Sequence, residues 1–430
     1  MSSAKEVKPA KNIKGTVELP ADKSISHRAA LFAALHESTS HISNFSAAAD
    51  PQSTLACLRQ LGIEIEAKGQ DLSIKGKGRY GFNEPEEPLD CGNSGTTMRL
   101  LSGIVGGAGV NCTLTGDESL SARTMKRIID PLRAMGIDIY GREDNFAPLK
   151  ISRKDPVKAL HFELPIPSAQ LKSCVLLAGL YGKNTTSVIE TIPSRDHTER
   201  LLQLPIELKK DRKIIGSDNS MVIPEQSYRI PNDFSAAAFW LVAGSIHKQG
   251  SVRLTDVGIN PSRTAALKIL QKMGAEISMV KENREAIEPF ANLHITGSTL
   301  QPVTITEKLV PNLIDEIPIL AIAMLFAEGT STIRGAEELR HKETDRLSAL
   351  SDMLKKAGAS FKEMEDGLEI HGDPKFVPRP ASYNSYHDHR IAMSAAILAS
   401  KGSEPSKVKG GECTDISYPG FWEDLKMLTN

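Results

Sequence analysis

The sequence predicts an α/β protein of two globular domains, each assembled from repeated units of helices and short strands. Three observations support this prediction. The chain has 430 residues, which is long for a single hydrophobic core. Apolar residues make up 40% and charged residues 24% of it, as in ordinary folded domains. The phrase Leu-x-x-x-Gly-x-x-hydrophobic also recurs along the chain, which indicates an internal repeat.

Each copy of this phrase predicts the end of a helix and the strand that follows it. A glycine just past a helix favours the left-handed conformation that ends it, and the alternating residues beyond favour a strand. The period of roughly 70 to 84 residues exceeds that of ordinary solenoid repeats and favours two domains with several copies each. The copies centre on Gly62, Gly136, Gly274 and Gly358, with a weaker one at Pro205, and second strands are expected at Leu72, Leu149, Leu293 and Leu368.

Charge and hydropathy exclude several classes of partner. The net charge of −1 provides no global basic field for nucleic acid or anionic lipid, so neither is expected as a partner. Residues 1–14 lack the apolar segment of a signal peptide, and the apolar run 317–327 is too short to cross a bilayer. Five scattered cysteines without a C-x-x-C pair are typical of buried thiols in a reducing compartment. We therefore expect a cytoplasmic protein.

The stretch from Pro20 to Arg28 predicts an extended entry followed by a helix. Asp22 or Ser24 is the expected N-cap. Lys23 then lies at the helix N-terminus, where free N–H groups and the dipole favour an anion. Arg28 follows one turn after Ser24 on the same face. A capped helix with solvated basic residues is the alternative for this segment alone.

Two further segments repeat this arrangement. Gly95 precedes an apolar helical pattern, with Arg99 four residues later, and Ser168 precedes another, with Lys172 four residues later. The glycine-rich loop that ends at Gly95 is not a Walker A loop, because it lacks the Gly-Lys-Ser/Thr end of that motif. Three helix starts, each with a basic residue one turn on, suggest several N-termini directed at one anionic site.

Two other basic segments lie in the first half. Ser121 is a candidate helix cap that places Arg123 in the first turn, which is unfavourable unless an anion lies beside it. Arg195 belongs to a second basic cluster. Asp196 and His197 follow it and could suggest a catalytic dyad, but adjacent residues rarely face each other in the way that proton transfer requires.

The second half carries acidic groups at helix starts. Asp315 and Glu316 precede an apolar helix that contains Pro318. Asp315 as N-cap, with Pro318 in the first turn, is one interpretation. The other is a partly buried carboxylate that serves as a general base.

A denser cluster of charges follows. Lys342 and Arg346 are expected to share one face of a helix, with Glu343 beside that face. Residues 387–389 include two histidines and an aspartate, but their spacing matches no common zinc motif. No metal is therefore expected, and Arg390 is interpreted as one more basic residue at a helix start.

Taken together, these segments resemble the 5-enolpyruvylshikimate-3-phosphate (EPSP) synthase family, in its class II form. The resemblance runs from about residue 10 to residue 425. The motifs are Lys23-Ser-Ile-Ser-His-Arg28, Gly92-Asn-Ser-Gly95-Thr, Ser121-Ala-Arg123, Pro167-Ser-Ala-Gln170-Leu-Lys172, Arg195-Asp196-His197, Ile314-Asp315-Glu316-Ile-Pro318, Lys342-Glu343-Thr-Asp345-Arg346 and Asp388-His389-Arg390.

The resemblance implies the two-domain enolpyruvyl transferase fold. In that α/β fold each domain has three βαβαββ units, and helix N-termini face the interdomain cleft. The first domain would span residues 22–232 and form the shikimate 3-phosphate side of the cleft. The second would be discontinuous, comprising residues 1–21 and 233–430, and would carry the catalytic carboxylates and phosphoenolpyruvate contacts.

The resemblance also implies a reaction and a set of residues. The enolpyruvyl group of phosphoenolpyruvate would be transferred to the 5-hydroxyl of shikimate 3-phosphate, with release of phosphate and without a cofactor or metal. The family acts as monomers in the shikimate pathway and is the target of glyphosate, to which alanine at the Gly95 position is associated with tolerance. The resemblance implies that Asp315 is the proton acceptor and Glu343 the proton donor, with Lys23 assisting proton transfer. The residues implied to bind shikimate 3-phosphate are Lys23, Ser24, Arg28, Ser168, Gln170, Arg195, Asp315 and Lys342. Those implied to bind phosphoenolpyruvate are Lys23, Gly95, Arg123, Gln170, Arg346 and Arg390.

One departure and two alternatives remain. Some family members have a lysine phosphoenolpyruvate contact where this chain has Glu412, so no such contact is assigned. The sister transferase acting on UDP-N-acetylglucosamine typically has Lys-Asn-Ala-Ala near its start and a loop cysteine. Lys23-Ser-Ile-Ser and Glu118 here argue against it. A non-catalytic anion-binding protein of the same fold would be expected to lack the acid–base carboxylates, whereas Asp315 and Glu343 are present.

Overall fold

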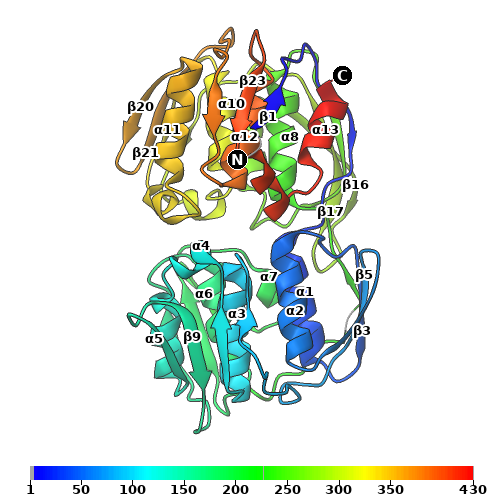
Figure 1. Ribbon diagram of the computed structural model, residues 1–430, viewed down its shortest axis with the longest axis vertical. Coiled ribbons are helices and arrows are strands. Elements are labelled where there is room, and N and C mark those ends of the chain that lie inside the picture. Colours follow the sequence, from blue (N-terminus) through cyan, green and yellow to red (C-terminus); the bar gives the residue numbers. More distant parts are fainter. Residues whose placement is uncertain (1–3, 226, 430) are drawn as a thin grey trace. The chain divides into compact units, whose positions relative to one another are not determined.

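The computed structural model describes residues 4–225 and 227–429. The chain forms two compact units. The continuous unit is Ala21–Ile230, and the discontinuous unit combines the residues up to Pro20 with those from Pro231 onward. Figure 1 labels many of the helices and strands of both units.

The described residues of the continuous unit form three sheets, with helices between their strands. Its elements are α1 (Lys23–Leu35), β3 (Thr39–Ser43), α2 (Ala49–Gln60), β4 (Glu64–Lys68), β5 (Asp71–Lys75), β6 (Leu89–Asp90), α3 (Gly95–Ala108), β7 (Cys112–Thr115), α4 (Glu118–Ser121), α5 (Lys126–Ala134), β8 (Asp138–Arg142), β9 (Phe146–Ser152), β10 (His161–Glu163), α6 (Ala169–Gly179), β11 (Thr186–Glu190), α7 (His197–Leu202), β12 (Ile206–Lys209), β13 (Arg212–Ser217) and β14 (Tyr228–Arg229).

The discontinuous unit is built in the same way. Its elements are β1 (Ala4–Val7), β2 (Lys14–Val17), α8 (Phe234–Ile246), β15 (Ser251–Gly258), α9 (Ala265–Lys272), β16 (Glu276–Asn283), β17 (Phe290–Thr296), β18 (Thr304–Ile305), η1 (Val310–Asn312), α10 (Ile317–Leu325), β19 (Gly329–Ile333), η2 (Glu337–His341), α11 (Arg346–Ala357), β20 (Ser360–Met364), β21 (Gly367–Gly372), β22 (Ser382–Asn384), α12 (His389–Ala399), β23 (Ser406–Lys409), η3 (Gly411–Ile416) and α13 (Phe421–Thr429).

The sheets repeat one pattern of strand pairing. In the sheet β6-β7-β9-β8 the first pair is parallel and the next two are antiparallel. The sheets β10-β11-β13-β12 and β18-β19-β21-β20 have the same pattern. Each uses a helical crossover between its parallel strands, as a βαβ unit requires. The α/β fold of repeated βαβαββ units is thereby confirmed.

The glycines predicted to end helices do so. Gly62, Gly136, Gly274 and Gly358 have φ values of 85°, 84°, 90° and 78°, the left-handed region in which glycine avoids the cost of a Cβ. Each lies between a helix and the first strand of an antiparallel pair. In the weaker copy, Gln203 takes the left-handed position instead, with φ of 51°.

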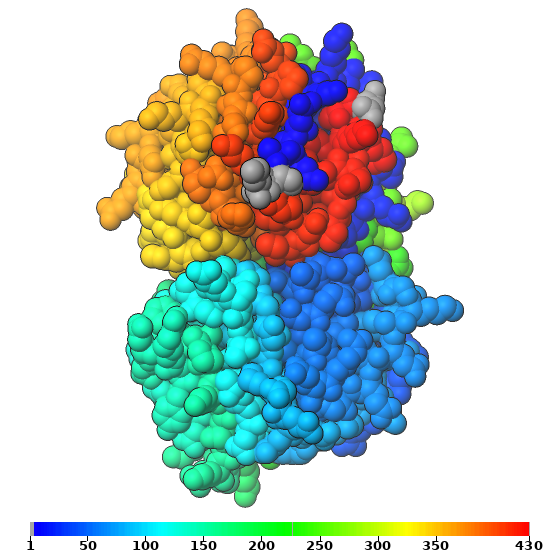
Figure 2. Space-filling model, in the orientation of Figure 1, coloured from blue at the N-terminus to red at the C-terminus, as the bar shows by residue number. Residues whose placement is uncertain are grey.

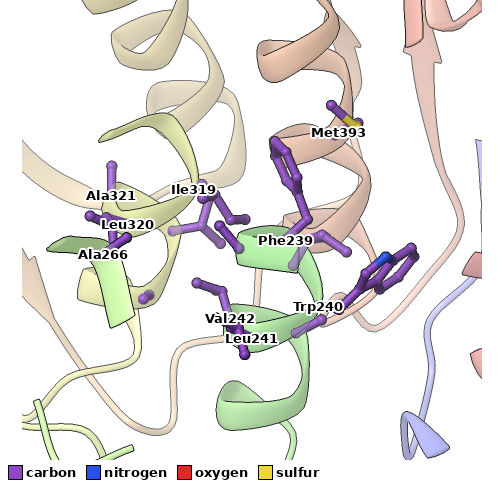
Figure 3. Close-up of a cluster of buried hydrophobic side chains, with 14 of the residues drawn as sticks. Phe239, Trp240, Leu241, Val242, Ala266, Ile319, Leu320, Ala321 and Met393 are labelled. Atoms are coloured by element: carbon purple, nitrogen blue, oxygen red, sulfur yellow. The ribbon is translucent and has the colours of Figure 1, made fainter. Parts of the chain in front are cut away.

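The core of the discontinuous unit is formed around three apolar helices. Every residue of α8 and α10 is buried, and so is every residue of α12, as expected for helices that are surrounded by other elements. Figure 3 shows Phe239 and Trp240 of α8, Ile319 of α10 and Met393 of α12 in this cluster. The Trp240 indole N–H is also satisfied, since it donates to the Tyr418 hydroxyl at 2.8 Å.

The first strand of the described chain pairs with the last one in the discontinuous unit. Strand β1 pairs antiparallel with β23, with Ala4 opposite Lys409 and Val7 opposite Ser406. Figure 2 shows these first residues, in blue, beside the red C-terminal residues on the surface. The pairing covers an edge of the parallel pair β22-β23, which would otherwise expose unpaired backbone groups.

Two local predictions were wrong. Ser121 ends the short helix α4 instead of capping a new one, because Asp117 caps α4 by accepting from the Leu120 N–H. Arg123 therefore lies between α4 and α5. Lys342 and Arg346 do not share a helix face, because Asp345 caps α11 and starts it at Arg346.

No helix among the described residues is long and apolar enough to cross a membrane.

Candidate functional site

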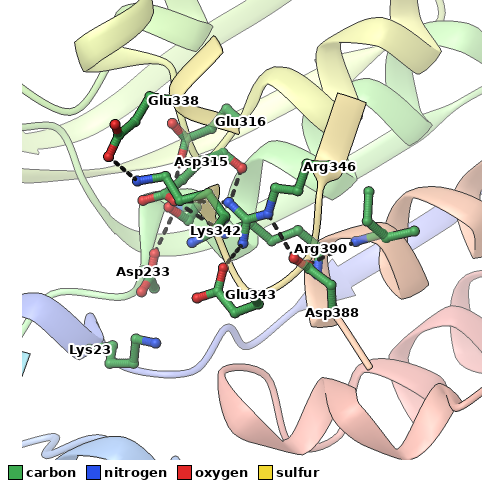
Figure 4. A network of polar contacts seen from close by, with 12 residues as sticks. Lys23, Asp233, Asp315, Glu316, Glu338, Lys342, Glu343, Arg346, Asp388 and Arg390 are labelled. Carbon is green, nitrogen blue, oxygen red and sulfur yellow. Dashed lines mark hydrogen bonds and ion pairs between the residues drawn. The ribbon is translucent and has the colours of Figure 1, made fainter. Parts of the chain in front are cut away.

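Predicted site residues of the discontinuous unit meet in one charged cluster (Figure 4). Arg346 donates from Nε to Asp388 at 2.8 Å and from Nη2 to Glu343 at 2.6 Å. One carboxylate oxygen of Asp315 lies 3.5 Å from Arg346 Nη1 and 3.5 Å from Arg390 Nε. Arg346 therefore contacts three carboxylates, and one of them, Asp315, also contacts Arg390.

Helix caps place both arginines at helix starts. The Asp388 side chain accepts hydrogen bonds from the backbone N–H groups of Arg390 and Ile391 and so caps the N-terminus of α12. Asp345 caps the N-terminus of α11 in the same way, and Arg346 is the first residue of that helix. A cation at a helix N-terminus opposes the helix dipole, so the adjacent carboxylates compensate an unfavourable position. A bound anion would be stabilised there by the arginines and by the helix ends.

Burial and neighbouring charges shift the pKa values of two basic groups in the cluster, Arg346 and Lys342. Burial alone would lower the pKa of Arg346, but the carboxylates of Asp388, Glu343 and Asp315 raise it above its usual range. Arg346 is therefore a permanent cation. For Lys342 burial dominates and lowers the pKa, although Asp315 and Glu338 oppose the shift. The Lys342 side chain is still 26% exposed, and a lysine whose pKa is lowered is a group that enzymes use for proton transfer and anion binding.

Asp315 and Glu316 are neighbours with different surroundings. Glu316 is fully buried and accepts from the Ser235 hydroxyl, while Arg263 lies 3.6 Å from it. The Asp315 side chain is 19% exposed, and the Arg390 guanidinium donates to its backbone carbonyl at 3.0 Å. Glu316 is thus held in the interior at the start of α10, whereas the Asp315 side chain remains partly exposed. Asp315 is not a side-chain N-cap, because α10 has no side-chain cap.

The continuous unit holds the predicted basic residues of the first helix. Asp22 caps α1 by accepting from the Ile25 N–H at 2.8 Å, so the predicted cap is confirmed. Lys23 is the first residue of α1 and pairs with Asp50 at 2.9 Å. Arg28 is 3% exposed and donates to the Ser24 carbonyl, so the alternative of a solvated arginine at this position is wrong.

A second group in the continuous unit surrounds Gly95. Arg99 donates to the Gln170 carbonyl oxygen at 2.6 Å, and the Gln170 amide donates to the Thr96 hydroxyl at 2.9 Å. A Cβ on Gly95 would lie 2.8 Å from Arg99 Nη1 and 3.7 Å from Arg123 Nη1. Gly95, Arg123 and Gln170 are therefore close to one another, with Arg99 between them.

The remaining predicted residues occupy helix starts or the loop before a helix. Ser168 caps α6 by accepting from the Leu171 N–H at 3.3 Å, as predicted. Arg195 lies half-buried in the loop that leads into α7. Arg123 donates to the Asn93 side chain at 2.7 Å, which connects it to the glycine-rich loop.

One basic residue is not where its spacing predicted. Lys172 does not face an anionic site with Ser168. It is fully buried, with its ammonium 3.0 Å from Glu190 and 2.7 Å from Glu199. These two glutamates already neutralise it, so a bound anion is not needed to explain its position.

Several partners were missed by reasoning from the sequence. Asp388 and Asp50 were given no role, although each neutralises a predicted site cation. Arg99 was noted only for its spacing, and its contact with Gln170 joins residues 71 positions apart. An acidic residue directly before a basic helix start was the available signal for Asp388. No local signal pointed to Asp50.

No group of three or more His, Cys, Asp or Glu side chains in the part of the chain that the structure describes has an arrangement that could hold a metal ion.

Comparison with known proteins places the chain in a family. The family model for EPSP synthase (3-phosphoshikimate 1-carboxyvinyltransferase) matches residues 7–425. A 3-phosphoshikimate 1-carboxyvinyltransferase of Salinibacter ruber is 48% identical over 425 residues, covering 98% of both chains. The solved EPSP synthase of Acinetobacter baumannii superposes with a TM-score of 0.86 at 38% identity, over 99% of this chain and 98% of that one. The chain therefore belongs to the EPSP synthase family.

Proposed function

We propose that the protein transfers the 1-carboxyvinyl group of phosphoenolpyruvate to the 5-hydroxyl of shikimate 3-phosphate and releases phosphate. The observation that carries the proposal is the cluster in which Asp315 and Glu343 contact the same arginine, Arg346, while Asp315 also contacts Arg390. This set supplies two acid–base groups and two bidentate anion ligands. The family's names describe the same reaction.

The reaction makes specific demands on these groups. In the addition step the 5-hydroxyl oxygen bonds to C2 of phosphoenolpyruvate, its proton passes to a base, and C3 gains a proton from an acid. In the elimination step the C2–O bond to phosphate breaks and C3 returns a proton, which restores the double bond. We assign the base to Asp315 and the acid to Glu343, with Lys23 assisting both transfers.

The substrates carry several negative charges, which basic side chains would hold. For phosphoenolpyruvate we assign Arg346 and Arg390, whose positions at helix starts favour an anion. The remaining phosphoenolpyruvate contacts are proposed for Lys23, Gly95, Arg123 and Gln170. For shikimate 3-phosphate the proposed contacts are Lys23, Ser24, Arg28, Ser168, Gln170, Arg195, Asp315 and Lys342. Holding both reactants in one orientation lowers the entropic cost of their reaction.

The proposal extends to the domains and the cellular setting. We assign the shikimate 3-phosphate side to the domain 22–232. The carboxylates and most phosphoenolpyruvate contacts belong to the domain formed by residues 1–21 and 233–430. A monomeric, cytoplasmic enzyme of the shikimate pathway is part of the proposal. The free cysteines found among the described residues fit a reducing compartment. Size-exclusion chromatography with light scattering measures the oligomeric state.

A phosphate-release assay tests the proposed function directly. Phosphoenolpyruvate is supplied with shikimate 3-phosphate in one reaction and with UDP-N-acetylglucosamine in another. Release with shikimate 3-phosphate alone is the expected result. Release only with the nucleotide sugar would favour the sister transferase, and binding without release would favour an anion-binding protein.

A further inference from the structure

Four charged side chains form a buried network in the continuous unit. Lys172 of α6 contacts Glu190, the last residue of β11, and Glu199 of α7, at 3.0 and 2.7 Å. Lys213 of β13 contacts Glu199 at 2.9 Å. The side chains of Lys172, Glu190 and Glu199 have 0% exposure, and that of Lys213 has 16%. Two cations and two carboxylates thus balance one another inside the unit.

Such a network is not explained by stability alone. Removing charges from water is costly, and well-packed apolar residues of similar volume are often at least as stabilising as a buried ion pair. The charge on Glu199 is nevertheless favoured. Burial alone would raise the pKa of Glu199, but the ammonium groups of Lys172 and Lys213 lower it below its usual range. We therefore looked at what the network holds in place.

Each partner of the strongest pair stands next to a hydroxyl that binds Arg28. Ser173 follows Lys172 in the chain, and its hydroxyl accepts from Arg28 Nη2 at 3.0 Å. Thr198 precedes Glu199, and its hydroxyl accepts from Arg28 Nε at 2.8 Å. The two hydroxyls also contact each other at 2.7 Å. The ion pair between Lys172 and Glu199 therefore joins α6 to α7 next to the hydroxyls that accept hydrogen bonds from the Arg28 guanidinium.

The other carboxylate fixes the loop that carries Arg195. Glu190 Oε1 accepts from the Ser194 N–H at 3.1 Å and from the Ser194 hydroxyl. This contact closes the turn between β11 and α7 directly before Arg195. Glu190 also contacts Lys172, so one ammonium connects the loop of Arg195 with the helices that hold Arg28.

We propose that Lys172, Glu190 and Glu199 are positioning residues that hold Arg28 and Arg195 in the orientation that binds the phosphate-bearing acceptor substrate. They do so through Ser173, Thr198 and Ser194, and they do not contact the substrate. This inference rests on the proposed function, in which both arginines bind shikimate 3-phosphate. It predicts that damage to the network weakens binding of that substrate and leaves phosphoenolpyruvate binding unchanged.

The role of the two hydroxyls that bind Arg28 is tested with two uncharged substitutions, Ser173→Ala and Thr198→Val. Each removes one hydrogen bond to the Arg28 guanidinium, and a bond to a charged group is worth more than an average one. We expect KM for shikimate 3-phosphate to rise about tenfold in each variant, with KM for phosphoenolpyruvate within about twofold of the wild type. Ser217→Ala is the matched control: this buried hydroxyl donates to the α6 carbonyl of Leu176 and does not contact Arg28.

The ion pair is tested with Lys172→Met, Glu199→Gln and the double variant that carries both. Each single variant leaves one buried charge uncompensated, because Lys213 then faces two carboxylates in Lys172→Met, and Glu190 faces two ammonium groups in Glu199→Gln. Both single variants are therefore expected to lower Tm strongly. The double variant retains a balanced Lys213 and Glu190, so its Tm is expected to exceed that of both single variants. Its KM for shikimate 3-phosphate should nonetheless stay raised by about tenfold, which corresponds to about 1.4 kcal/mol, because the ion pair that joins α6 to α7 is lost.

The outcomes separate positioning from a structural role. Wild-type KM for shikimate 3-phosphate in the hydroxyl variants and the double variant would overturn the inference. Equal increases in both KM values, or the same increase in Ser217→Ala, would also overturn it. Titration calorimetry with shikimate 3-phosphate alone repeats the test without turnover. Wild-type binding without phosphate release would refute the proposed function, whereas unchanged binding in the variants would refute the positioning role.

Discussion

Replacing Glu343 with glutamine tests the proposed acid most directly. The substitution keeps the shape of the side chain and a hydrogen-bond acceptor for Arg346, but it removes the ionisable carboxyl group that can donate and regain a proton. General acid–base groups contribute about 10²- to 10⁴-fold to rate, which corresponds to about 3 to 5 kcal/mol of activation free energy. We therefore expect kcat to fall by at least about 100-fold.

The structure indicates that this loss will not come from unfolding. The Glu343 side chain is 25% exposed, although its partner Arg346 is 1% exposed, and loss of this partly exposed partner should cost about 1 kcal/mol. Arg346 retains Asp388 at 2.8 Å and Asp315 at 3.5 Å, so its charge stays compensated. The expected decrease in Tm is about 2 to 4 °C for a unit of this size.

The assay measures phosphate release at saturating substrates, together with thermal unfolding of the same preparation. Glu337→Gln is the matched control, since Glu337 lies in the nearby η2 turn and is exposed; its kcat should equal that of the wild type. A kcat for Glu343→Gln within threefold of the wild type would refute the assignment. A decrease matched by an equal loss of folded protein would do the same.

Three further predictions follow from the structure. In Gly95→Ala the new Cβ would lie 2.8 Å from Arg99 Nη1. We therefore expect steady-state kinetics to show a raised KM for phosphoenolpyruvate and a raised inhibition constant for glyphosate. An unchanged inhibition constant would contradict this mechanism. Burial lowers the pKa of His247 to about 4 from about 6.5 when unfolded. The folded state thus binds fewer protons, and its stability is full above pH 6.5 and lost as pH falls toward 4. Between pH 7 and 5 this loss should be about 2 kcal/mol in urea titrations and should be absent in His247→Gln; equal pH dependence in both proteins would count against it. Asp22→Ala removes the cap on the Ile25 N–H and should lower the free energy of unfolding, measured by thermal unfolding, by about 1 kcal/mol. Asp22→Asn should lower it little, because asparagine also caps helices. An equal decrease in both variants would show that the charge of Asp22 matters more than its cap.

Local chemistry made much of the fold predictable. A helix cap or a terminating glycine acts within three or four residues, so Asp22, Ser168 and Gly62 could be read from their neighbours alone. The repeated phrase then gave the unit of the fold, because each copy ends a helix and starts an antiparallel pair. Where two local signals competed, the prediction failed. Asp117 caps α4 four residues before Ser121, and Asp345 restarts the helix between Lys342 and Arg346.

The basic residues of the opening segment show where local reasoning ends. The local sequence is sufficient to predict that Lys23 and Arg28 lie in the first turns of a helix whose end favours an anion. The family can also be predicted from the sequence, because its motifs follow one another in a fixed order along the chain. The charge environment of each group, in contrast, depends on the tertiary structure. Lys172, chosen by the same spacing as Arg28, meets Glu190 and Glu199 instead of a ligand. Coulomb energies depend on distance in space and on burial, and neither follows from separation along the chain.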